Sequence, residues 1–195
     1  MTPSAPAPKA PVPSPIAHRG PLEWRLLLNW LGEDGILTPQ DIDTVMQRFA
    51  AGTSAQHPLV RLASLGLKRA DTGTALELEA LTEWLAQRVK LPYLRIDPLK
   101  VDVARVADVM SITYAERRKA LPVYVGANEI TIATSEPLDV AWVEEILAHT
   151  RKTIQLAVAN PLDLQRYRTG GLAAAPDRLP ARPGHADGVR WPHYR

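Results

Sequence analysis

Few residues in this 195-residue sequence have the type and spacing that chemistry requires. The histidines show no metal-ligand spacing; they are His18, His57, His149, His185 and His193. Both His57 and His149 lie beside or at the end of a predicted helix, which favours a capping or exposed role over a ligand or a catalytic base. Glu144 and Glu145 are adjacent carboxylates on a predicted helix, where a solvated face is favoured over paired acid–base work.

Several catalytic motifs are missing from the sequence. It contains no cysteine, which excludes thiolate zinc sites, iron–sulfur clusters and cysteine nucleophiles. No Gly-Lys pair occurs, so a phosphate-binding P-loop cannot be drawn, and no Gly-x-Ser-x-Gly elbow is present. We therefore predict a protein that is not an enzyme and that has no ATP site, no metal and no cofactor.

The charge is concentrated at the two ends of the chain. Lys9 and Arg19 give the first 20 residues a net charge of +2, and five arginines against two aspartates give residues 168–195 a charge of +3. Because the whole chain carries only +2, the middle part is acidic, and it offers no charge argument for nucleic acid. Residues 190–195 combine aromatic and basic side chains, a composition that is compatible with binding nucleic acid or membrane. A disordered terminus without a binding role is the favoured interpretation.

The helices and strands that would position a site are predicted in two parts of the chain, which lie between an N-terminal and a C-terminal tail. Residues 1–20 form a Pro/Ala-rich segment and residues 169–195 a Pro/Arg-rich one, and both are predicted to be disordered. No stretch has the composition of a signal peptide or of a membrane span, so we expect a cytoplasmic protein. Between the tails we predict a helical part, 21–90, and a mixed part, 91–168.

Four short amphipathic helices are predicted in the helical part. The first covers 22–31, and Thr38 followed by Pro39 is a typical helix start for the second. A third helix is expected over 58–65. Thr74 and Glu77 have capping-box spacing, which predicts the start of a fourth helix there. Short connections between such helices indicate a small bundle.

The mixed part reads as helices followed by a small sheet. Asp102 and Ser111 can cap two helices, and segments 121–125 and 129–134 alternate as strands around a turn at 126–128. A helix following Pro137, with Val140, Val143, Ile146 and Leu147 inward, leads to a third strand over 153–158 and to a last helix capped by Asn160. A strand–helix–strand order implies a parallel crossover, so the fold class is α+β with a mixed sheet of about three strands.

The first helix has apolar residues over most of its circumference. A central core helix is the favoured interpretation, and a partner-docking face is the alternative. For docking, the candidate residues are Trp24, Leu28 and Trp30.

Residues 75–167 resemble the N-terminal domain of the ATPases that power type II secretion and type IV pilus assembly, the general secretory pathway protein E family. The order and spacing of several segments carry the resemblance. These are 81–85, 91–93 (Leu-Pro-Tyr), 114–117 (Tyr-Ala-Glu-Arg), 121–123 (Leu-Pro-Val), 130–139 (Ile-Thr-Ile-Ala-Thr-Ser-Glu-Pro-Leu-Asp), 158–161 (Val-Ala-Asn-Pro) and Tyr167.

Residues 26–67 look like a weaker version of the family's helical repeats. The matching positions are Leu27, Leu31, Gly35 and Ile36 in one copy and Leu59, Leu62, Gly66 and Leu67 in the other. In some relatives such repeats bind cyclic di-GMP through an Arg-Leu-Gly start. That start is absent here, because Arg25 is one residue out of register and His57 stands at the second arginine position.

The resemblance implies a bacterial docking and regulatory domain without the ATPase core. It would bind an inner-membrane platform protein, and a separate secretion ATPase subunit in addition, so that it lies in the cytoplasm and meets the membrane only through its partner. The alternative is a cyclic di-GMP sensor of the same family. The residues leave open whether the chain is a stand-alone domain, a fragment or a truncated product.

Overall fold

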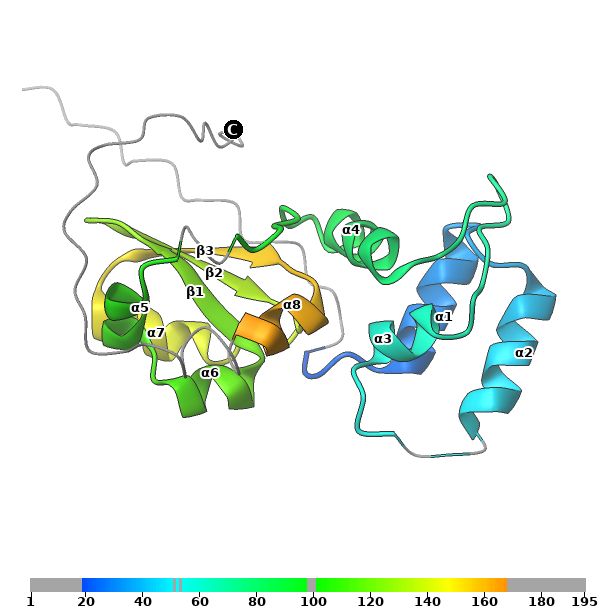
Figure 1. Cartoon of the computed structure of the whole chain (residues 1–195), viewed down its shortest axis with the longest axis horizontal. Helices are drawn as coiled ribbons and strands as arrows, with labels where there is room; N and C mark the ends of the chain where they lie inside the picture. Colours follow the sequence, from blue (N-terminus) through cyan, green and yellow to red (C-terminus); the bar gives the residue numbers. More distant parts are fainter. Residues whose placement is uncertain (1–18, 51, 53, 98–100, 168–195) are drawn as a thin grey trace, which may run out of the picture.

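The computed structural model describes residues 19–167, except 51, 53 and 98–100. Nearly all of the two predicted disordered tails lies outside the described residues. Eight helices and one three-stranded sheet are found in the described part, which confirms the predicted α+β class. Helices α1 to α3 lie at one end, the sheet with α5 to α7 lies at the other, and α4 and α8 lie between them (Figure 1).

The first three helices form where the sequence predicts them: α1 (Trp24–Glu33), α2 (Pro39–Ala50) and α3 (Pro58–Ala63). At the start of α2, Thr38 Oγ1 accepts from the Asp41 N–H at 3.1 Å, and Asp41 Oδ2 accepts from the Thr38 N–H at 3.2 Å. This reciprocal pair satisfies two amides that the helix itself leaves unbonded. Gly35 ends α1 with a φ of +66°, a conformation that favours glycine.

The predicted capping box at Thr74 is wrong. Helix α4 is Leu78–Arg88. Its N-cap residue is Glu77, whose side chain makes no capping hydrogen bond. The chain before it doubles back on itself, so that the Arg69 N–H donates to the Thr74 carbonyl and the Leu76 N–H to the Leu67 carbonyl, both at 2.8 Å. Because residues 74–76 are committed to this pairing, they cannot form the first turn of a helix.

The sheet has the predicted topology. Strands β1 (Ala120–Val125) and β2 (Glu129–Thr134) are antiparallel neighbours, and β3 (Thr153–Val158) pairs with β2 in parallel. Ile132 lies opposite Pro122 on one side and Leu156 on the other. The hairpin and the parallel crossover are therefore both confirmed.

Four helices pack around this sheet: α5 (Val103–Val109), α6 (Ile112–Arg118), α7 (Val143–Thr150) and α8 (Pro161–Arg166). The predicted caps of α5, α6 and α8 are confirmed, since Asp102, Ser111 and Asn160 each accept from a backbone N–H in the first turn. The alternating side chains of β2 supply two cores, with Ile130 and Ile132 in one and Ala133 in the other.

The predicted start of α7 is wrong. Residues 137–138 and 141–142 form turns, and the helix begins only at Val143. The indole N–H of Trp142 donates to the Asp139 carbonyl at 2.6 Å, which folds this fully buried ring under the helix. As a result Trp142 and Ile146 point inward, whereas Leu147, which was expected in the core, is 47% exposed.

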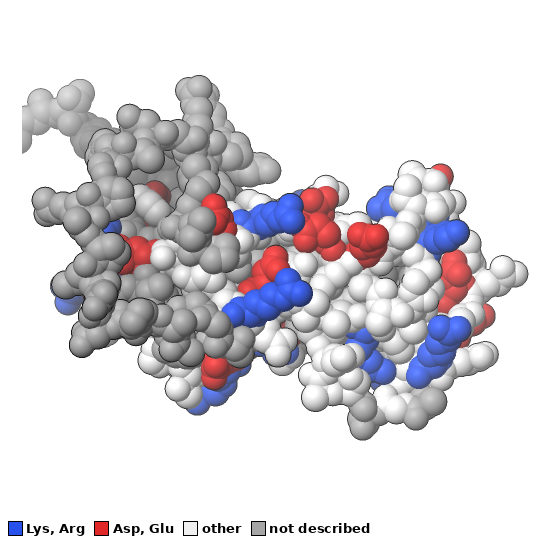
Figure 2. Space-filling model, in the orientation of Figure 1, with Lys and Arg blue, Asp and Glu red and all other residues white. Residues whose placement is uncertain are grey.

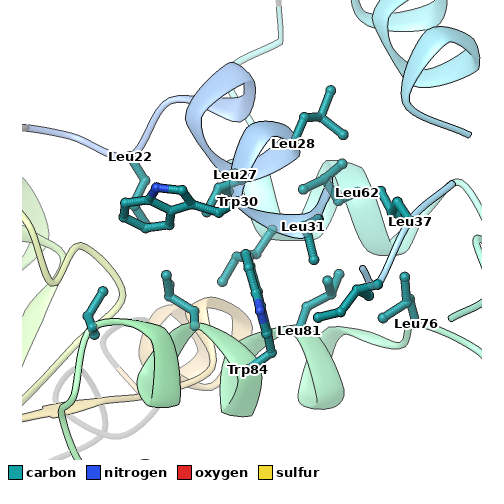
Figure 3. Packing of buried hydrophobic residues seen from close by; sticks show 14 of the residues in the cluster. Leu22, Leu27, Leu28, Trp30, Leu31, Leu37, Leu62, Leu76, Leu81 and Trp84 are labelled. Atoms are coloured by element: carbon teal, nitrogen blue, oxygen red, sulfur yellow. The ribbon is translucent and has the colours of Figure 1, made fainter. Parts of the chain in front are cut away.

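The helical part and the sheet share one hydrophobic core. Leu138 and Val158 belong to the same buried cluster as the leucines and tryptophans of α1 and α4. Figure 3 shows Trp84 of α4 directed toward α1, with Leu31 and Leu81 beside it. Burial of apolar surface across this boundary holds the two parts together.

Candidate functional site

A buried carboxylate lies where the helical part meets the sheet. Glu136 follows β2 and is 3% exposed. Its Oε2 accepts from the Leu22 N–H at 2.6 Å, and its Oε1 accepts from Lys119 Nζ at 2.5 Å. The Gly20 N–H also donates to the Leu138 carbonyl at 3.2 Å. The segment that leads into α1 is thus attached to the loop after β2, 114 residues further along the chain.

His57 completes this junction from α3. Its Nδ1 accepts from the Leu59 N–H at 3.3 Å, which caps α3, and its Nε2 lies 3.1 Å from the Ser135 carbonyl and 3.5 Å from Glu136 Oε1. Since Nδ1 is an acceptor, the proton must be on Nε2, and the ring is neutral. The predicted capping role of His57 is confirmed.

Burial is the main cause of this neutral state. It lowers the pKa of His57 from 6.5 to about 4, against the attraction of Glu136 and with the added repulsion of Lys119. The 3.5 Å contact between His57 and Glu136 is therefore not an ion pair at neutral pH. We call Leu22, His57, Lys119, Ser135 and Glu136 the polar junction.

The polar junction is built to hold structure rather than to react. A cleft of about 480 Å³ passes over His57, Lys119 and Ser135. A general acid–base pair needs a free position that a substrate can reach. Here the carboxylate of Glu136 already has two donors, and both ring nitrogens of His57 already have partners.

A second polar link lies on the same boundary. The Tyr93 hydroxyl donates to Glu79 Oε1, and Asn160 Nδ2 donates to Glu79 Oε2 at 3.2 Å. The hydrogen bond from Tyr93 lowers the pKa of Glu79, and burial raises the pKa of Tyr93. This link ties the start of α4 to the start of α8.

Two of the three predicted docking residues are core residues. Leu28 is 2% and Trp30 is 8% exposed, and both belong to the helical core in Figure 3. The apolar face of α1 is covered at these two positions, because α1 contacts both α2 and α3 and shares its core with α4. Trp24, at the first turn of α1, is only half-buried and keeps the exposure that docking needs.

The remaining candidate residues stay apart. Glu144 and Glu145 are exposed on α7, as expected of a solvated face, and the Tyr114 hydroxyl donates to Glu145. Within residues 19–167, outside the three gaps, no group of His, Cys, Asp and Glu could hold a metal ion. In the same ranges, no helix combines the length and the apolar composition that crossing a bilayer requires.

The two repeat-like segments have the same local structure. Gly35 and Gly66 have φ values of +66° and +64°, each just after a helix. The leucines that precede them, Leu27, Leu31, Leu59 and Leu62, are fully buried. His57 occupies the arginine position of the second copy and is enclosed in the polar junction. In the first copy Arg25 is one residue out of register, so neither copy has an arginine at that position.

The comparisons with known proteins agree with the fold. Residues 89–169 match the model of the MshEN domain family. This match supports the resemblance to the N-terminal domain of the type II secretion and type IV pilus assembly ATPases.

The polar junction was not predicted from the sequence. The signal for it in the sequence is Glu136, which lies between an apolar strand and Pro137.

The chain is similar to one curated relative in particular, the type IV pilus assembly ATPase TfpB of Acinetobacter baylyi. The two are 41% identical over 113 residues, which are 57% of this chain and 19% of TfpB. The chain thus spans only a small part of that relative's length.

Two solved structures are similar to this chain, and the first of them shares its fold. The structure of MshE with cdg has a TM-score of 0.54 and 22% identity, covering 74% of this chain and 97% of that one. The N-terminal domain of XpsE has a TM-score of 0.47 and 18% identity, covering 73% and 91%.

Proposed function

We propose that this chain is a non-catalytic docking and regulatory module of a type II secretion or type IV pilus assembly system. Its helical part, α1 to α3, binds the cytoplasmic part of an inner-membrane platform protein, and the chain is held at the membrane only through that partner. The observation that carries this proposal is the match of residues 89–169 to the MshEN domain family in a sequence without a P-loop.

The arrangement of the two parts supports docking by positioning. The shared core, the polar junction and the Glu79 link fix the helical part on the sheet, so force on one part is passed to the other. Helices α1 to α3 lie at the end away from α5 and α7, where a partner can reach them (Figure 1). Lysines, arginines and carboxylates are interspersed on the face in Figure 2, which gives no support to nucleic-acid binding.

Cyclic di-GMP sensing is the second candidate, favoured by the likeness in fold to MshE, which was solved with cdg. Two observations speak against it in this chain. The guanidinium of Arg25 lies over the Trp24 ring, one position from where the family's arginine starts the repeat. His57 is buried as a helix cap. We therefore rank docking first.

Calorimetric titration of the purified chain tests the proposal. The probes are the cytoplasmic fragments of the platform proteins encoded by the same bacterium, together with cyclic di-GMP and ATP. We expect one fragment to bind, no heat from cyclic di-GMP, and no ATP turnover. ATP hydrolysis that copurifies with the chain, or failure of every fragment to bind, would overturn it.

A matched pair of aromatic substitutions locates the surface. Trp24→Ala removes a half-buried ring at the helical end, and Tyr124→Ala removes a ring that is 51% exposed at the far hairpin. We expect only the first to weaken binding of the fragment, because aromatic residues are frequent anchors of interfaces.

A further inference from the structure

Two arginines stack on two neighbouring aromatic rings where α1, α2 and α3 converge. The rings of Trp24 and Phe49 meet edge to face, 5.2 Å between centroids and at 75°. The Arg25 guanidinium lies 4.5 Å from the Trp24 centroid, and the Arg61 guanidinium lies 4.0 Å from the Phe49 centroid. We call these four residues the arginine–aromatic patch.

The charges of this patch are unneutralised. Among the described residues, no carboxylate lies within 4.0 Å of Arg25 or Arg61, whereas Arg69 and Arg88 each bind aspartate. The contact recorded for the Arg61 side chain besides the ring is to the Gly52 carbonyl, at 3.5 Å. Most of the N–H donors of both groups therefore remain available.

Stacking fixes these donors before any ligand arrives. A guanidinium held flat on a ring has lost part of its rotamer freedom, so a later hydrogen bond costs less entropy. Planar guanidinium groups bind carboxylates through two parallel N–H···O bonds. The patch therefore matches a surface that offers carboxylates next to an apolar side chain.

We propose that the arginine–aromatic patch binds an acidic segment of the partner protein, with Arg25 and Arg61 each receiving a carboxylate and the edge of Trp24 an apolar side chain. This inference rests on the proposed docking function and names the chemistry of its interface. Charge complementarity is the reason for an acidic partner.

An anionic membrane surface is the other anion that two arginines could meet. Each basic residue near such a surface strengthens binding by only about fivefold. The remainder of the folded part is acidic, and an extended anionic surface would repel it. A peptide segment touches the patch alone and avoids this repulsion, which is why we commit to a protein carboxylate.

The test uses the full chain and the purified cytoplasmic platform fragment that binds it. Arg25→Gln and Arg61→Gln remove the charges and keep much of the length, and Arg48→Gln is the control, an exposed arginine of α2 outside the patch. We expect each patch variant to raise the Kd about tenfold or more, the control to change it less than twofold, and the wild-type Kd to rise with salt.

Two further measurements separate the outcomes. Arg25→Lys keeps the charge but not the planar fork, so we expect a smaller loss of affinity than for Arg25→Gln at an unchanged melting temperature. Binding to vesicles of phosphatidylglycerol and phosphatidylethanolamine should be negligible for every variant.

A fragment that binds all variants equally would overturn the patch and leave docking intact. Vesicle binding that depends on the two arginines would overturn the protein partner in favour of the membrane. If no platform fragment binds the wild-type chain, the proposed function and this inference fail together.

Discussion

Removing the carboxylate of Glu136 should loosen the attachment of the helical part. In Glu136→Ala the buried Leu22 N–H loses a charged acceptor at 2.6 Å, a hydrogen bond of the class that contributes about 1.5–3 kcal/mol. The Lys119 side chain is 44% exposed and returns to water, so its ion pair adds less than about 1 kcal/mol. We expect a total loss of about 2–4 kcal/mol.

Glu136→Gln separates the two contributions. The amide oxygen can still accept from Leu22, while the charge that attracts Lys119 is gone, so the loss should fall to about 1–2 kcal/mol. Glu144→Ala is the control, since this exposed glutamate of α7 should change stability by no more than about 0.5 kcal/mol.

Urea unfolding followed by circular dichroism and by tryptophan fluorescence gives the free energies. Hydrogen exchange of the Gly20 and Leu22 amides reports the junction itself, and both should exchange faster in Glu136→Ala. If Glu136→Ala costs no more than Glu144→Ala, the polar junction does not hold the two parts together.

The other predictions concern titration, the core and docking. Above pH 6.5 His57 is neutral in both states. Between pH 6.5 and about 4 only the unfolded state takes up the proton, so stability should fall by about 3 kcal/mol as the pH is lowered, and much less in His57→Asn when both are measured by urea unfolding. Ile132→Ala should lower the free energy of unfolding by about 2–5 kcal/mol, because Ile132 is fully buried in β2. Leu147 is half-exposed, so Leu147→Ala should lower it by less than about 1 kcal/mol. Equal losses would mean that the strand register is wrong. Trp24→Ala should cost more binding free energy for the platform fragment than unfolding free energy. The reverse order would make Trp24 a core residue.

Local signals predicted most of the elements. Helix caps at Thr38, Asp102, Ser111 and Asn160 depend on residues within one turn, and the structure contains each of them. The alternation around Ile132 gave the strands and their pairing, because one face of a half-buried strand must be apolar.

Signals that depend on distant contacts were missed. Thr74 has the spacing of a capping box, but its carbonyl accepts from Arg69, and tertiary pairing overrode the local preference. Leu147 fits an apolar stripe, yet the buried ring of Trp142 set the rotation of α7.

The polar junction could not be predicted from neighbouring residues. Glu136 meets Leu22 across 114 positions and His57 across 79, so nothing adjacent in the sequence marks it as buried. The same holds for Leu28 and Trp30. Their apolar pattern favours a core helix but is also compatible with a docking face, and the placement of α2 to α4 decides between the two.

Hydrogen–deuterium exchange tests the docking assignment most directly. The chain is measured alone and in complex with the cytoplasmic platform fragment, peptide by peptide. We expect exchange to slow in the peptides that contain Trp24, Phe49 and Arg61, and to be unchanged in the β1–β2 hairpin. Slower exchange confined to the hairpin and α7, with α1 to α3 unaffected, would contradict docking by the helical part.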